Sequence, residues 1–152
     1  MTADHFVHQD FRVLTPEAFD FVLNNELKRA VRSQNFLTLV LMDPRAGAPA
    51  VDAMREVARV VSREVRETDL LSASPEGRLS LVLLDADLQS SMRVIERVRA
   101  RLEHYQFTTP IDLEIGAACC PTHGADPGTL KRAAEARTST SRPPARGASN
   151  AQ

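Results

Sequence analysis

The spacing of apolar residues in the first half of the chain predicts two helices separated by a strand. Thr15 can cap a helix that begins at Pro16, and apolar residues then recur at helical spacing as far as Val31. Residues 36–42, FLTLVLM, form a continuous apolar run of strand length, which is typical of a central strand covered on both faces. A second amphipathic helix is predicted over 51–65.

The second half of the chain continues the alternation. Two short strands are predicted on either side of 75–78, where proline and glycine mark a turn. A helix follows a cap at Asp87, a strand covers 111–118, and a last helix runs over 126–137. The order α-β-α-β-β-α-β-α predicts an α/β (α+β sandwich) fold of the ferredoxin-like type. In that fold a mixed, mainly antiparallel sheet carries helices packed on it, mainly on one face.

The composition changes after residue 137. Residues 138–152, TSTSRPPARGASNAQ, contain no large apolar side chain and are rich in Ser, Thr, Pro, Ala and Gly. Such a segment cannot bury enough surface to offset the entropy lost on ordering. The sequence therefore predicts one domain over 1–137 and a disordered tail over 138–152.

Overall composition limits the classes of function. The chain has 152 residues, 43% hydrophobic and 26% charged, with a net charge of −1, which does not indicate a nucleic-acid surface. No apolar run approaches the roughly 20 residues that span a bilayer, and the N-terminus does not resemble a signal peptide, so a cytoplasmic protein without membrane contact is predicted.

Cysteine and histidine positions give no sign of a metal or cofactor. Cys119 and Cys120 are adjacent, so on a strand their side chains point to opposite faces, and two reduced, buried thiols are expected. The four histidines lack metal-ligand spacing with these cysteines. No metal or cofactor is predicted.

Residues 66–84, RETDLLSASPEGRLSLVLL, carry a family resemblance. Arg66 and Asp69 form an R-x-x-D motif, and five residues separate Asp69 from Pro75. This pattern resembles the GGDEF (diguanylate cyclase) family, in which R-x-x-D precedes a Gly-Gly-Asp/Glu-Glu-Phe signature. The resemblance implies the nucleotidyl-cyclase palm fold. The positions of the signature are here occupied by Pro75, Glu76, Gly77, Arg78 and Leu79.

The departures from the family pattern predict that the domain is not an enzyme. In the family, divalent cations for catalysis are held by a carboxylate at the end of the first strand and by acids of the hairpin turn, and the resemblance places Asp43 at the first of these positions. Gly77 and Arg78 occupy the two acidic positions, and an arginine would repel Mg²⁺. The chain between Asp43 and Val57 is also too short for the family's nucleotide-binding segment. Asp43 is then a vestigial metal position in a degenerate GGDEF-like domain.

Two interpretations remain for a domain without catalysis. In the family, R-x-x-D is an inhibitory product site, so the resemblance implies a cyclic di-GMP effector that binds through Arg66, Asp69 and Arg97. Alternatively, Arg66 ends a helix and Asp69 starts a strand, and the two side chains are either solvated or paired with each other. The chain would then be a ligand-free interaction module, either a homodimer or a scaffold for another signalling protein.

Overall fold

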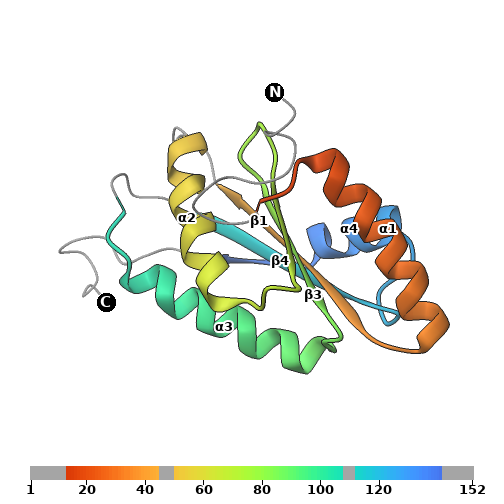
Figure 1. Ribbon diagram of the computed structural model, residues 1–152. Helices are drawn as coiled ribbons and strands as arrows, with labels where there is room; N and C mark the ends of the chain where they lie inside the picture. The colour runs from red at the N-terminus through yellow and green to blue at the C-terminus, as the bar shows by residue number, and fades with distance from the viewer. Residues whose placement is uncertain (1–12, 45–49, 108–111, 142–152) are drawn as a thin grey trace.

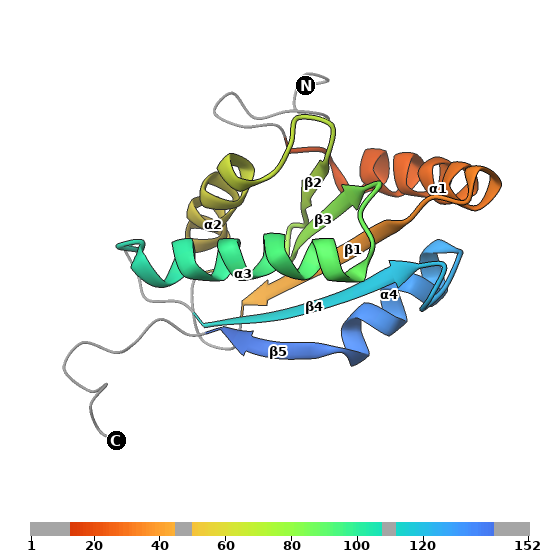
Figure 2. The same cartoon turned by 90° about the horizontal axis from the view of Figure 1, so that it is seen from below.

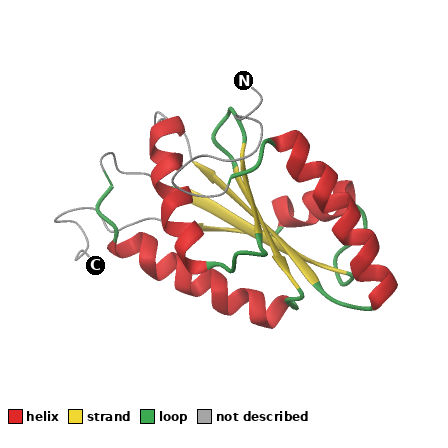
Figure 3. Cartoon of the chain, viewed as in Figure 1, coloured by secondary structure: helices red, strands yellow, loops and turns green. Residues whose placement is uncertain are grey.

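The computed structural model describes residues 13–44, 50–107 and 112–141, which form helices and strands in alternation (Figure 1, Figure 3). None of the described helices is long and apolar enough to cross a membrane. In chain order the elements are α1 (Pro16–Ser33), β1 (Leu37–Pro44), α2 (Ala50–Glu64), β2 (Leu70–Ala73), β3 (Leu79–Leu84), α3 (Leu88–His104), β4 (Leu113–Cys120), α4 (Pro127–Ala136) and β5 (Thr138–Ser141).

Side-chain caps begin three of the four described helices where the sequence predicts them. Oxygens of Thr15, Asp87 and Asp126 each accept the backbone N–H three residues further on, at 3.1, 2.8 and 2.9 Å. These bonds satisfy N–H groups that have no partner inside a helix. They also lower the pKa of both aspartates, because the bonds favour the ionised carboxylate.

The five strands of the described residues form one sheet in the order β2-β3-β1-β4-β5, and Figure 2 shows them in this order. All four ladders are antiparallel. The isolated bridge from Leu14 to Ser72 is parallel, so the sheet is mixed but mainly antiparallel, as predicted. The eight elements from α1 to α4 confirm the predicted order of helices and strands.

Helices cover both faces of the sheet, so the expectation that they lie mainly on one face is wrong (Figure 1, Figure 2). α2 and α3 pack on one face with Val40 and Met42 of β1. α1 and α4 pack on the other with Leu37, Leu39 and Leu41. Alternate residues of a strand point to opposite faces, so a strand covered on both sides is apolar throughout.

β5 corrects the predicted disorder of 138–152. Thr138–Ser141 pairs with Gly116 to Leu113 of β4, so the ordered domain extends past residue 137; residues 142–152 lie outside the described residues. α4 lies so close to β4 that a Cβ added to Gly116 would stand 2.1 Å from the Ala134 carbonyl oxygen. Position 116 therefore requires glycine.

Two apolar residues on the predicted amphipathic helices are exposed. Val31 near the end of α1 is 51% exposed, and Met92 in the second turn of α3 is 41% exposed. Both lie on faces of their helices that turn away from the sheet. Periodicity alone did not distinguish them from their buried neighbours.

The end of β4 holds both cysteines, free and buried as expected. The Cys119 N–H donates to His123 Nδ1 at 2.8 Å, so this nitrogen carries no proton. Burial, with a smaller effect of nearby Arg137, lowers the pKa of His123.

Candidate functional site

Residues 74–78 form a tight turn between β2 and β3. The Ser74 N–H donates to the Arg78 carbonyl at 2.8 Å, the Gly77 N–H donates to the Ser74 carbonyl at 2.9 Å, and the Arg78 N–H donates to Ser74 Oγ at 3.0 Å. Gly77 has φ = 101°, a conformation that glycine adopts without strain. Pro75 and Glu76 are exposed at the tip.

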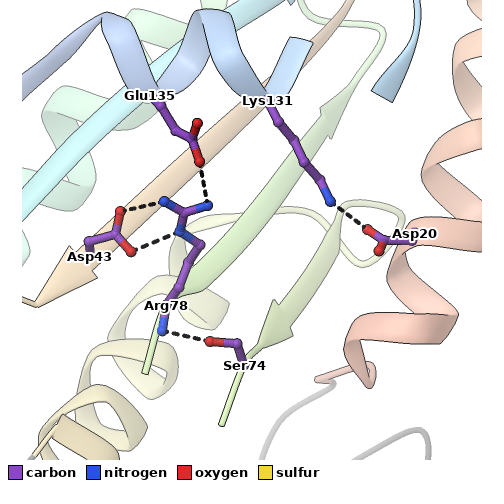
Figure 4. A network of polar contacts seen from close by, with 6 residues as sticks. All are labelled: Asp20, Asp43, Ser74, Arg78, Lys131 and Glu135. Atoms are coloured by element: carbon purple, nitrogen blue, oxygen red, sulfur yellow. Dashed lines mark hydrogen bonds and ion pairs between the residues drawn. The ribbon is translucent and has the colours of Figure 1, made fainter. Parts of the chain in front are cut away.

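Arg78 makes a three-part contact with two carboxylates from other elements (Figure 4). Leu79 pairs with Met42 in the ladder, which places the preceding arginine beside Asp43. Arg78 Nε and Nη2 donate to the two Asp43 carboxylate oxygens at 2.8 and 3.0 Å, and Nη1 donates to Glu135 Oε2 at 3.0 Å. The side chains of Arg78 and Asp43 are 32% and 33% exposed.

The guanidinium therefore stands among the carboxylates as a fixed cation. Its hydrogen bond to Asp43, assisted by the one to Glu135, raises the pKa of Arg78, so its charge is permanent. A fork that matches both carboxylate oxygens is the strongest arrangement of an ion pair. The contact joins the end of β1, the hairpin turn and α4. In the described residues, no group of three or more His, Cys, Asp or Glu side chains is placed to hold a metal ion.

The R-x-x-D motif lies at the opposite end of the same hairpin, where β2 begins and β3 ends. The Asp69 carboxylate accepts the Arg66 N–H at 2.9 Å and the Leu84 N–H at 3.1 Å. Its side chain is only 2% exposed, whereas that of Arg66 is 62% exposed. The Arg66 guanidinium donates to the Leu84 carbonyl and lies 3.6 Å from Asp69 Oδ1.

Arg97, the third residue predicted to bind cyclic di-GMP, is hydrogen-bonded to the end of α2. Its Nε donates to Glu64 Oε1 at 3.0 Å and its Nη2 to the Glu64 carbonyl at 2.7 Å. Arg101 Nε stands 3.0 Å from the other Glu64 carboxylate oxygen. The Arg97 side chain remains 51% exposed. Arg97 is thus tied to a residue two positions before Arg66, while Arg66 and Asp69 are in direct contact.

Two of the carboxylates that pair with these arginines, those of Glu135 and Glu64, were not identified from the sequence. Glu135 is 57 residues from Arg78 along the chain, and only the packing of α4 on β4 brings them together. Glu64 meets Arg97 and Arg101 because α2 and α3 pack side by side. No spacing rule signals contacts of this kind, since they depend on the tertiary fold.

Comparison with known proteins supports the fold. No protein-family model matches the chain, and no curated protein matches it. Among solved structures, the GGDEF domain of YfiN from Pseudomonas aeruginosa is 20% identical, with a TM-score of 0.72 over 82% of this chain and 86% of that one. The coiled coil and GGDEF domain of DgcB from Caulobacter crescentus, in complex with c-di-GMP, is 14% identical, with a TM-score of 0.72 over 89% and 79%.

A third match is the diguanylate cyclase SiaD from Pseudomonas aeruginosa, in complex with its activator SiaC. It is 18% identical, with a TM-score of 0.70 over 90% of this chain and 58% of that one. All three similarities extend over most of the present chain at low sequence identity. The chain therefore has the fold of GGDEF domains, the nucleotidyl-cyclase palm.

Proposed function

We propose that this chain is a GGDEF-like signalling domain that has lost diguanylate cyclase activity and acts by binding. The observation that carries the proposal is the pairing of Arg78 with Asp43 and Glu135. Joining two nucleoside triphosphates requires divalent cations that neutralise phosphate charge and activate the attacking hydroxyl. A guanidinium hydrogen-bonded to both oxygens of Asp43 competes with a metal ion for that carboxylate and repels it.

The turn itself supports the same conclusion. Pro75 supplies no backbone N–H, and Glu76 adds negative charge where a triphosphate would approach. Gly77 and Arg78 leave the turn without the two acids of the family signature. Incubation with GTP and Mg²⁺ or Mn²⁺, followed by chromatography, tests the proposal, because formation of cyclic di-GMP at this site would refute it.

The first candidate ligand is cyclic di-GMP, bound at the R-x-x-D end of the hairpin. Arg66 and Arg97 support it, because both guanidinium groups are more than half exposed and flank the end of α2. Arginine forks suit guanine edges and phosphate oxygens. The structural neighbour DgcB was itself solved with c-di-GMP. Calorimetric titration is the test: binding weaker than about 100 μM would reject this ligand.

The alternative is a module that binds only protein. It is favoured by the internal satisfaction of the motif: Asp69 bonds two backbone N–H groups, and Glu64 holds Arg97. The exposed Phe21 on α1, 69% accessible, offers an apolar contact for a partner or for a second copy. Light scattering coupled to size exclusion distinguishes a second copy of the chain from another protein as the partner. A dimer that Phe21→Ala dissociates supports self-association, whereas a monomeric wild type points to another protein.

A further inference from the structure

The β2–β3 ladder stops before β3 ends. Leu70 pairs with Val82, so the same register would place residue 68 opposite Leu84. Residue 68 instead lies in the turn closed by the bond from the Asp69 N–H to the Arg66 carbonyl, at 3.0 Å. Among the described residues, Leu84 therefore has no strand partner on this side, although it pairs with Leu37 of β1 on the other.

Side chains of the R-x-x-D motif occupy the place of the missing strand partner. Asp69 Oδ1 accepts the Leu84 N–H at 3.1 Å, and the Arg66 guanidinium donates to the Leu84 carbonyl. Asp69 Oδ2 accepts the backbone N–H of Arg66 at 2.9 Å, which fixes the turn. A carboxylate that accepts backbone N–H groups while buried is costly to disturb, because each donor would be left unsatisfied.

We infer that Asp69 is a positioning residue that completes the end of the sheet and orients Arg66, and that it does not contact a ligand. The side chain of Asp69 is 2% exposed, so a guanine could reach it only if the groups that cover it moved. Arg66, 62% exposed, is the group presented to solvent. The part of this inference that concerns a ligand rests on the proposed binding of cyclic di-GMP.

The first experiment uses the ligand-free protein, and hydrogen exchange at single amides is followed by NMR. Asp69→Asn keeps the shape but places an NH₂ group where a carboxylate oxygen accepted a bond. Exchange should accelerate at least about tenfold, relative to central amides of β1, at whichever of the Arg66 and Leu84 amides faces the new NH₂ group. Asp20→Asn, which changes an exposed ion-paired carboxylate on α1, should leave both amides unchanged. Equal exchange at these amides in Asp69→Asn and wild type would overturn the inference.

Arg66→Ala serves as a second variant in case Asp69→Asn does not fold. It removes the guanidinium from the Leu84 carbonyl but keeps the carboxylate, to which the N–H groups of residue 66 and Leu84 still donate. Exchange at both amides should therefore stay within about threefold of wild type. Acceleration of either amide by about tenfold or more in this variant would show that the guanidinium and not the Asp69 carboxylate holds the end of the sheet, and would contradict the inference.

The second experiment compares binding of cyclic di-GMP with that of its inosine analogue, which lacks the 2-amino groups. A positioning role predicts that Asp69→Asn weakens both ligands alike and keeps the affinity ratio within about twofold. A ratio that falls toward one would show that Asp69 reads guanine and would refute the inference. If the wild type binds neither ligand, the proposed ligand fails, and the exchange measurements still decide the role of Asp69.

Discussion

Replacing Arg78 with alanine should destabilise the folded protein, because this one side chain joins three elements. The substitution removes two hydrogen bonds to Asp43 and one to Glu135. It also leaves two carboxylates without the cation between them. The backbone of the turn should persist, since the Arg78 N–H and carbonyl bond to Ser74 independently of the side chain.

The size of the expected loss in stability depends on how exposed Arg78 and its two carboxylate partners are. Hydrogen bonds to charged groups contribute on the order of 1.5–3 kcal/mol when shielded from water, whereas exposed ion pairs contribute about 0.2–1 kcal/mol. Arg78 and Asp43 are about one-third exposed and Glu135 is 47% exposed, so the contact lies between these cases. We expect Arg78→Ala to cost about 1–2 kcal/mol, which corresponds to a melting temperature about 3–8 °C lower.

Urea unfolding and thermal melting measure this loss, with Lys131→Ala as the matched control. Lys131 makes a single, more exposed ion pair with Asp20, also at 3.0 Å (Figure 4), and its removal should cost less than about 1 kcal/mol. A double-mutant cycle with Asp43→Asn should give a coupling energy of about 1 kcal/mol. Strictly additive effects of the two substitutions, or a loss for Arg78→Ala no larger than for Lys131→Ala, would refute the reasoning.

Three further results are expected. Gly116→Ala should lower the free energy of unfolding by about 1–3 kcal/mol in urea, because the new Cβ would meet the Ala134 carbonyl. Stability should fall as the pH drops below about 6.5, since the pKa of His123 is lowered on folding and the unfolded chain binds the proton first; His123→Ala should flatten this dependence in melting curves taken across that range. If calorimetry detects cyclic di-GMP binding, Arg66→Ala should weaken it about ten- to a hundredfold.

The fold was accessible from the sequence because its strongest signals are local. Thr15, Asp87 and Asp126 mark helix starts by their own hydrogen bonds, and the apolar run of β1 records burial on both faces. β5 gave no such signal. Thr138–Ser141 contains no apolar side chain, and its pairing with β4 is made by the backbone, to which any residue other than proline contributes in the same way.

The candidate site was only half accessible for a related reason. The spacing of Arg66 and Asp69 identified one end of the hairpin, and the pairing of these two residues was among the predicted alternatives. The partner of Arg78 on α4 could not be inferred, because Glu135 is brought to the turn by helix packing. Likewise, the burial of Asp69 depends on where β2 stops relative to β3, and a one-residue change of register would alter it.

The central claim is that Arg78, paired with Asp43, has replaced the catalytic cations of a diguanylate cyclase. Incubation of the purified protein with GTP and Mg²⁺ or Mn²⁺, with chromatographic detection of products, tests it most directly. We predict no cyclic di-GMP above a protein-free control with either metal. Asp43→Asn is the matched variant, since it removes the carboxylate that a catalytic metal would need. Cyclic di-GMP formed by the wild type and lost in Asp43→Asn would contradict the claim.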